Sequence, residues 1–192
     1  MLDRLRLPAL PVLRGDRVLL REPRGSDIDD RLRHPIDPAE EDGYGSSWRR
    51  EWDGSRYHTR EHLVAARARP LLQGAYAWSV EYDGHCIGSA GLEVDTDQHC
   101  ATYSVGLFVA ELRGHGLGRE ITRLVLAWAF TVLAAHRVQL EVLAFNDRAI
   151  GCYLACGFRH EGIRREAMLY PDGWQDLIQM GILSAEYAAS LP

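Results

Sequence analysis

The spacing of apolar residues changes in the middle of the chain. Residues 99–109 are expected to form a strand. Over 116–134 the apolar positions recur every three or four residues and predict an amphipathic helix; they are Ile121, Leu124, Val125, Trp128 and Val132. Apolar and polar residues then alternate over 137–145, which predicts a strand. The succession of strand, helix and strand predicts a parallel pair joined by a right-handed crossover.

Turn residues divide the rest of the chain into shorter elements. We expect a helix capped by Ser26 and another helix that Gly157 terminates. The other predicted elements are strands at 17–21, 75–82, 86–94, 158–169 and 174–183 and helices at 59–72 and 147–156. Adjacent hairpins would make the sheet mixed. The prediction is one α+β domain over 1–192, with residues 1–13 as an N-terminal extension and helices flanking a central mixed sheet.

Composition excludes several classes of protein. A chain of 192 residues suits one domain. All 22 basic residues are Arg, and no Lys is present. P-loop NTPases, pyridoxal phosphate enzymes and protein kinases each need a particular Lys, so these three classes are disfavoured. The net charge of -5 argues against nucleic acid or an anionic membrane as a partner.

No apolar run is long enough to span a bilayer, and Met1–Arg21 lacks the apolar core of a signal peptide. We therefore expect a cytoplasmic protein whose four Cys residues are reduced thiols. The dipeptides His85-Cys86 and His99-Cys100 lie at distant points of a predicted hairpin, roughly 26 Å apart at about 3.3 Å per residue. One metal ion cannot join them, so no metal site is predicted.

The strongest chemical motif is Arg113-Gly114-His115-Gly116-Leu117-Gly118-Arg119, between the strand 99–109 and the helix that follows it. Glycines let backbone approach a ligand closely, and a helix N-terminus offers unpaired N–H groups to an anion. The loop suits a pyrophosphate, with Arg113 and Arg119 adding charge. Its glycine spacing differs from the dinucleotide fingerprint. A Gly-rich turn that only permits tight packing is the alternative.

A second segment follows the strand 137–145 and runs from Asn146 through Tyr153 to Gly157-Phe158. Together the two segments resemble the GNAT superfamily of N-acetyltransferases. The tail, with Glu161-Gly162 and Asp172-Gly173-Trp174-Gln175-Asp176, is similar to the branch that acetylates the N-termini of ribosomal proteins and related amines. The resemblance covers roughly residues 14–186.

The resemblance implies acetyl-CoA as cosubstrate, bound across a V-shaped opening between the two parallel strands. The end of the first strand would meet the pantetheine through its backbone, and the glycine loop would hold the pyrophosphate. The implied cofactor-binding residues are Leu107, Phe108, Val109, Arg113, Gly114, His115, Gly116, Leu117, Gly118, Arg119 and Asn146.

The resemblance also implies two catalytic residues. Tyr153 falls where the family places a general acid for the departing CoA thiolate, because a phenol stays protonated at pH 7. Glu141 falls at the offset of a general base, with Glu93 as the reserve candidate. A buried core aromatic and a solvent-facing strand carboxylate are the alternatives for Tyr153 and Glu141.

The expected function is transfer of an acetyl group to a primary amine, either a protein N-terminus or a small molecule. Alternatives are a polyamine or aminoglycoside-type antibiotic acetyltransferase, and a non-catalytic acyl-CoA-binding module. The stretch 26–42 carries seven acids and two bases, a local charge of -5, and a cationic acceptor could gather there. Charged helices are usually only solvated faces. We allow for a homodimer.

Overall fold

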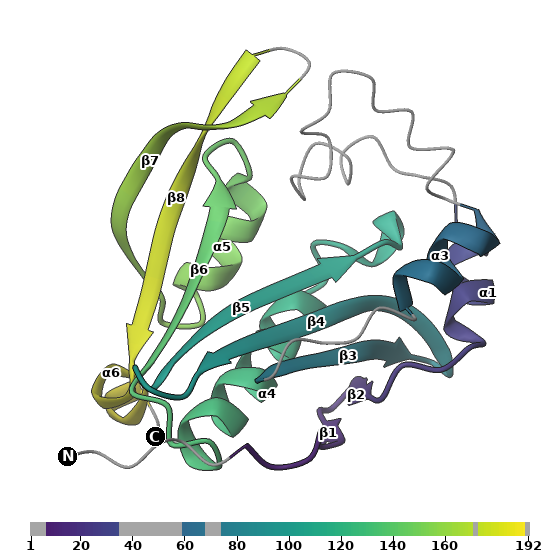
Figure 1. Cartoon of the computed structure of the whole chain (residues 1–192), viewed down its shortest axis with the longest axis horizontal. Helices are drawn as coiled ribbons and strands as arrows, with labels where there is room; N and C mark the ends of the chain where they lie inside the picture. The colour runs from purple at the N-terminus through teal and green to yellow at the C-terminus, as the bar shows by residue number, and fades with distance from the viewer. Residues whose placement is uncertain (1–6, 35–58, 68–73, 171–172, 191–192) are drawn as a thin grey trace.

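The computed structural model describes residues 7–34, 59–67, 74–170 and 173–190. Eight strands form one sheet in the order β1-β2-β3-β4-β5-β6-β8-β7 (Figure 1). Only β5 and β6 pair in parallel; the other neighbours in this sheet are antiparallel. The strands are β1 (Leu13–Arg14), β2 (Val18–Arg21), β3 (Ala75–Tyr82), β4 (His85–Asp95), β5 (Cys100–Leu107), β6 (Arg137–Leu143), β7 (Arg159–Tyr170) and β8 (Gly173–Leu183).

The described helices are α1 (Asp27–Arg33), α3 (Arg60–Arg67), α4 (Leu117–Thr131), α5 (Asp147–Leu154) and α6 (Ser184–Ser190), with a short 3-10 turn η2 (Ala110–Leu112). The predicted α+β architecture and its parallel pair are confirmed. The sequence pattern missed β1 and α6, which are short and lack a clear apolar period. None of the described helices is both long and apolar enough to be a membrane span.

Strand alternation places α1 and α4 on opposite faces of the sheet. Trp78 of β3 packs edge-on against Trp128 of α4, with ring centroids 5.5 Å apart. Its neighbour Ser79 points the other way and donates a 2.6 Å hydrogen bond to Asp27 of α1. The face toward α4 therefore carries the main apolar core, and the opposite face is polar and partly open.

The expected N-terminal extension is partly fastened to the sheet. The carbonyl of Pro8 accepts a hydrogen bond from the Tyr76 hydroxyl at 2.9 Å, and that of Pro11 accepts one from the Trp78 indole at 2.8 Å. Both donors belong to β3. Pro8 and Pro11 thus contact the same strand that packs against α4.

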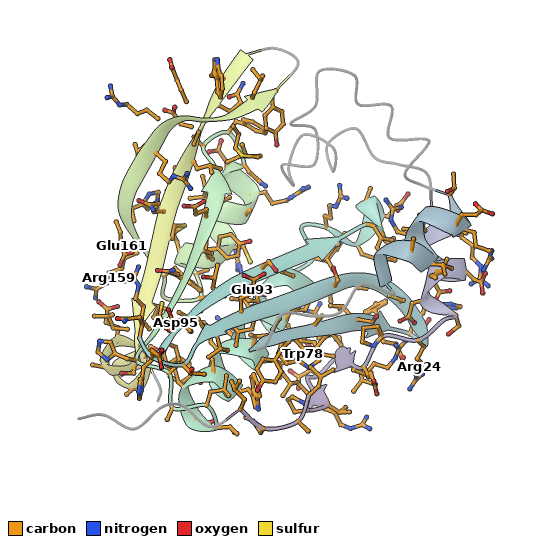
Figure 2. All side chains as sticks on the ribbon, viewed as in Figure 1. Arg24, Trp78, Glu93, Asp95, Arg159 and Glu161 are labelled. Carbon is orange, nitrogen blue, oxygen red and sulfur yellow. The ribbon has the colours of Figure 1, made fainter. Side chains whose placement is uncertain are left out.

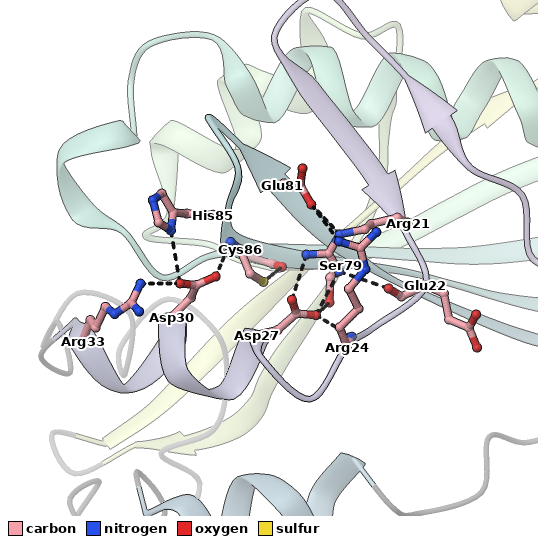
Figure 3. A network of polar contacts seen from close by, with 11 residues as sticks. Arg21, Glu22, Arg24, Asp27, Asp30, Arg33, Ser79, Glu81, His85 and Cys86 are labelled. Carbon is pink, nitrogen blue, oxygen red and sulfur yellow. Dashed lines mark hydrogen bonds and ion pairs between the residues drawn. The ribbon is translucent and has the colours of Figure 1, made fainter.

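A buried ion pair holds α1 on the sheet (Figure 3). Arg21 donates to both carboxylate oxygens of Asp27, at 2.8 and 3.1 Å, and its Nε donates to Glu81 at 2.5 Å. The Arg24 N–H donates to Asp27 at 2.7 Å. Ser26 occupies the expected cap position of α1 but makes no side-chain cap hydrogen bond. Asp27 receives the local N–H donor instead.

Other acids of the stretch 26–42 are also used internally. Asp29 pairs with Arg60 of α3. Asp30 accepts from Arg33 at 2.8 Å and from the backbone N–H of Cys86 at 2.8 Å. Asp37, Glu40, Glu41 and Asp42 lie outside the described residues. The three described acids therefore stabilise the position of α1 rather than forming a free acidic face.

From the Arg21–Asp27 ion pair we predict how the stability of the fold depends on pH. Burial acts to raise the pKa of Asp27, but hydrogen bonds from Arg21, Arg24 and Ser79 lower it from 3.8 to about 2. Asp27 binds a proton at a higher pH in the unfolded chain than in the folded one. The contribution of ionised Asp27 to the stability of the fold is therefore complete above pH 4 and is lost as the pH falls toward 2. Urea denaturation should show Asp27→Asn less stable at pH 7 by about 3–5 kcal/mol.

The same variant should show a shallower loss of stability between pH 4 and pH 2 than the wild type. Asp83→Asn is the matched control, because Asp83 is exposed in the β3–β4 turn and asparagine tolerates its φ of 49°. An equal loss of stability with acid in the wild type and in Asp27→Asn would show that Asp27 is not the source of this pH dependence.

Candidate active site

The two parallel strands separate soon after they meet. Their register pairs run from Cys100↔Arg137 to Thr102↔Gln139. Beyond these pairs β5 continues to Leu107, held by β4, while β6 continues to Leu143, held by β8. The two strands therefore form the arms of a V (Figure 1).

A cavity of about 940 Å³ opens between these arms. That volume is at the upper end of the usual range for small-molecule and cofactor sites. Its wall is built by the end of β5, the loop before α4, the end of β6, the first turns of α5 and two residues of the β7–β8 hairpin. The residues that line it include Tyr103, Ser104, Val105, Leu107, Leu112, Arg113, Gly114, His115, Gly116, Gly118, Arg119, Glu141, Val142, Leu143, Asn146, Asp147, Arg148, Cys152, Tyr153, Met168 and Leu177.

The glycine loop presents backbone to this cavity. Gly114 and Gly116 have φ values of 80° and 84°, in the left-handed region that favours glycine. Gly116 is the N-cap of α4 and provides no side-chain cap. Gly116 and Gly118 line the cavity, so the N-terminus of α4 faces it. The first N–H groups of a helix have no intrahelical acceptor, and such a helix end suits an anion.

An ion pair and three further hydrogen bonds fix the loop from behind. Glu120 of α4 accepts the backbone N–H of Arg17 at 2.7 Å and that of Val18 at 3.1 Å. The Arg17 side chain donates to Glu120 at 2.9 Å and to the His115 carbonyl at 2.9 Å. Burial acts to raise the pKa of Glu120, but these donors lower it overall. The turn between β1 and β2 therefore holds the loop in place.

Two of the predicted cofactor-binding residues also form hydrogen bonds with the protein's own backbone. Arg113 donates from Nε to the carbonyl of Leu107 at 2.9 Å, which ties the loop to the end of β5. Asn146 is the N-cap of α5, and its Oδ1 accepts the Ala149 N–H at 3.1 Å. Both residues lie in the cavity wall.

Three predicted cofactor-binding residues do not line this cavity: Phe108, Val109 and Leu117. The Phe108 side chain lies in a second cavity, and its N–H is bonded to the Ile87 carbonyl at 3.0 Å. Val109 and Leu117 are buried in the core. Successive residues at the end of β5 point to opposite sides, which separates the side chains of Leu107 and Phe108. The backbone contacts expected of this strand end with the pantetheine remain a prediction.

Tyr153 lies in the wall near the apex of the V. Its ring is 8% exposed and packs edge-on against Tyr103, with centroids 6.4 Å apart, and against Phe158 at 5.8 Å. Tyr103 is tied to α4 through a 3.1 Å contact between its hydroxyl and that of Thr122. The Tyr153 ring therefore has a fixed position between β5 and the core.

Glu141 lies on the polar face of β6, opposite the buried Leu140 and Val142. Arg164 of β7 donates to both of its carboxylate oxygens at 2.8 Å. The Gln179 amide also donates to Glu141, at 3.4 Å. Its side chain is 38% exposed, so solvent reaches the carboxylate.

The reserve candidate, Glu93, shares the polar face of the sheet. It pairs with Thr102 of β5 and Ala75 of β3. Figure 2 shows Glu93 on the side of the sheet opposite Trp78. Glu93 is exposed but is not in the cavity wall, whereas Glu141 is.

A second cavity of about 290 Å³ lies beside the end of β5. Gly88 and Ser89 of β4 and Phe108 form part of its wall, together with α1 residues that include Arg31. The Arg31 guanidinium carbon is 5.0 Å from the centre of the Phe108 ring. Consecutive residues of one strand end thus enter two different cavities, Leu107 the larger and Phe108 the smaller.

Several lining residues were missed by the sequence analysis. Tyr103 and Val105 share the strand face of Leu107, so alternation could have identified them. Met168 and Leu177 come from the distant β7–β8 hairpin, and no local pattern indicates them. Among the described residues, no group of three or more His, Cys, Asp or Glu side chains is placed to hold a metal ion.

Comparisons with known proteins agree with this geometry. The sequence profile described as "Acetyltransferase (GNAT) family" matches residues 36–158. A curated relative, the spermidine N(1)-acetyltransferase of Vibrio cholerae, is 29% identical over 96 residues, which are 50% of this chain and 55% of the relative. The chain therefore matches little more than half the length of that relative.

Solved structures share the fold over nearly the whole chain. A crystal structure of a putative acetyltransferase has a TM-score of 0.80 at 24% identity and covers 95% of both chains. The Vibrio cholerae spermidine N-acetyltransferase in complex with CoA and spermine has a TM-score of 0.76 at 21% identity, covering 91% of this chain and 99% of that one. At these identities the likeness shows the fold alone.

From the glycine loop we predict how a substitution at Gly116 changes the affinity for CoA. Gly116→Asp places a carboxylate at the N-terminus of α4 and forces a side chain onto a φ of 84°. Isothermal titration calorimetry with CoA should show a loss of affinity of at least tenfold, because the carboxylate repels phosphate and obstructs the backbone.

The matched control is Gly84→Asp. Gly84 has a similar φ of 78° in the β3–β4 turn, and a Cβ there would meet nothing within 4 Å. This variant introduces the same charge and similar strain away from the cavity and should bind CoA as the wild type does. Unchanged affinity in a folded Gly116→Asp protein would overturn the anion-site assignment.

Proposed function

The chain belongs to the acetyltransferase (GNAT) family, and on that basis we propose that it transfers an acetyl group from acetyl-CoA to a primary amine. One observation carries the proposal beyond family membership. A single cavity brings together the splayed ends of β5 and β6, the N-terminus of α4, Tyr153 and Glu141.

The residues of the cavity fit a CoA thioester. The glycine loop and the N-terminus of α4 suit a pyrophosphate. Arg113, Arg119 and Arg148 line the cavity together with the acids Glu141 and Asp147, and Glu141 is already paired with Arg164. The wall is therefore positively charged overall, which favours an anionic ligand. Bound acetyl-CoA supplies the acyl group in activated form.

Glu141 is proposed as the proton acceptor. An alkyl ammonium has a pKa of roughly 10 and must lose a proton before its nitrogen can attack. The Glu141 carboxylate is solvent-accessible, and two carboxylate oxygens offer about four acceptor positions. Arg164 and Gln179 use part of this capacity, so room remains for a water that relays the proton. Arg164 also fixes the carboxylate in place.

Tyr153 is proposed as the proton donor to the departing sulfur. The ring packs against Tyr103 and Phe158, and Tyr153 lines the cavity. Protonation of a thiolate as it leaves lowers the barrier to its departure. Tyr103, the other phenol of the cavity wall, contacts Thr122 of α4 through its hydroxyl.

The acceptor is proposed to be a primary amine, a protein N-terminus or a small molecule. The motif resemblance favours the ribosomal-protein branch, whereas the spermidine N(1)-acetyltransferase relative favours a polyamine. Purified protein should be incubated with acetyl-CoA and peptides, polyamines or aminoglycosides, and the acetylated product measured by mass spectrometry. Tight acetyl-CoA binding without any product would support the non-catalytic module instead.

Tyr153→Phe tests the proposed acid. It removes one hydroxyl and little volume, so turnover should fall by roughly 10²–10⁴-fold while acetyl-CoA affinity stays near the wild-type value. Steady-state kinetics and calorimetry measure the two quantities. Tyr187→Phe in α6, where Tyr187 stacks on Phe130 away from the cavity, is the control. Wild-type turnover in Tyr153→Phe would leave Tyr153 as a core aromatic.

Glu141→Gln and Glu93→Gln together test the proposed base. Both replace a carboxylate by an amide of the same shape on the same sheet face. Glu141→Gln should lower kcat/KM for the amine by at least tenfold. Glu93→Gln should retain the wild-type kcat/KM. The opposite pattern would transfer the role to Glu93.

A further inference from the structure

The second cavity, of about 290 Å³, has no part in the proposed cofactor site. Its large apolar side chains come from α1, α3 and the end of β5, and they are Ile28, Leu63 and Phe108. Glycines of β4 and β5 form part of the side toward the sheet. A Cβ on Gly88 would lie 2.1 Å from the Gly106 carbonyl oxygen, so no larger side chain fits there. The cavity therefore suits a small molecule or one end of it.

The acid in the wall of this cavity is already used by the protein. Of the described residues in the wall, Asp27 and Arg31 carry a charge. Asp27 accepts hydrogen bonds from the Arg21 guanidinium, the Arg24 N–H and the Ser79 hydroxyl (Figure 3). These donors take up the roughly four acceptor positions that two carboxylate oxygens offer. Asp27 therefore has no acceptor position left for the ammonium group of a ligand.

Arg31 is the cation of this wall. Its guanidinium carbon lies 5.0 Å from the centre of the Phe108 ring, and this cation–π contact helps to place the side chain. The Phe108 ring also contacts His34, the C-cap of α1, with ring centroids 5.9 Å apart. A guanidinium carries five N–H donors in a planar fork that matches a carboxylate. Arg31 can thus bind an anion without leaving Phe108.

We propose that Arg31 determines acceptor specificity and selects small aminocarboxylates in preference to polyamines. The carboxylate of the acceptor would form charge-assisted hydrogen bonds with Arg31. The second ammonium group of a polyamine would instead meet a like charge, with Asp27 already occupied by Arg21. The inference rests on the proposed function, because it assumes that the acceptor of the acetyl group occupies this cavity.

The end of β5 connects this selection to the chemistry. Leu107 lines the larger cavity and Phe108 the second one, so an acceptor held at Arg31 can extend its amine past the strand end toward the thioester. Acetyl transfer joins the amine nitrogen to the acetyl carbon and breaks the C–S bond. The ammonium group loses two protons, of which one goes to the CoA sulfur and one to solvent. The carboxylate of the acceptor only holds the molecule in place.

Matched acceptors test the preference. The full-length protein is assayed by mass spectrometry with acetyl-CoA and β-alanine, γ-aminobutyrate or δ-aminovalerate, each beside its amide and the diamine of equal length. For at least one chain length, kcat/KM should be at least tenfold higher for the carboxylate than for the diamine, because hydrogen bonds to a charged group are strong. Turnover of the diamines with no such preference at any length would overturn the inference.

Substitution of Arg31 tests the residue itself. Arg31→Met keeps an unbranched side chain against Phe108 and should lower kcat/KM for the aminocarboxylate at least tenfold, mainly through KM, and that for its amide much less. Arg31→Lys should restore part of the loss, and Arg31→Glu should reverse the preference toward the diamine. Arg33→Met is the control, because Arg33 belongs to the same helix, is 61% exposed and does not line the cavity. A wild-type preference in Arg31→Met would exclude this role.

A binding experiment separates this inference from the proposed function. Saturation-transfer NMR with γ-aminobutyrate and its two homologues, in the presence of CoA, needs no turnover. The wild type and Arg33→Met should give a signal, and Arg31→Met should give none. Equal signals in Arg31→Met and the wild type would overturn the role of Arg31, whether or not acetyl transfer occurs. Absence of acetylated product with every amine would refute the proposed function, while the NMR signals still decide whether Arg31 binds the carboxylate.

Discussion

The separation of β5 from β6 after Thr102↔Gln139 is the constraint on which the site depends. Each strand stays paired with its outer neighbour, so the sheet remains continuous while its centre opens. The contact between the two halves past that point is made by side chains, with the Tyr153 ring of α5 set against Tyr103 of β5. The same contact that closes the apex of the V also fixes the phenol in the cavity wall.

Charge in this protein is used mainly to fix structure. Arg21 and Asp27 hold α1 to the sheet, and Arg17 and Glu120 hold the glycine loop to the β1–β2 turn. Removing one partner of a buried pair leaves an uncompensated charge, so the Arg21–Asp27 geometry is strongly specified. A local charge sum taken from the sequence therefore overstates the acidity available to an acceptor near α1.

The end of β5 separates two chemical environments. Leu107 faces the larger, arginine-lined cavity, and Phe108 faces the smaller one beside α1. The two cavities therefore meet at one strand end, and the residues that line one do not line the other.

The sequence by itself determined most of the elements and their order, because apolar period and glycine position are local properties; the short β1 and α6 were the exceptions. The helix at Leu117–Thr131, the strand at Arg137–Leu143 and the motif from Asn146 to Tyr153 could all be predicted. The tertiary structure decided which partners meet. It paired Glu141 with Arg164, 23 residues away, brought Met168 and Leu177 to the cavity, turned Phe108 out of it, and used Asp27 and Asp30 in packing. Contacts between distant segments depend on strand register and splay, which no local pattern encodes.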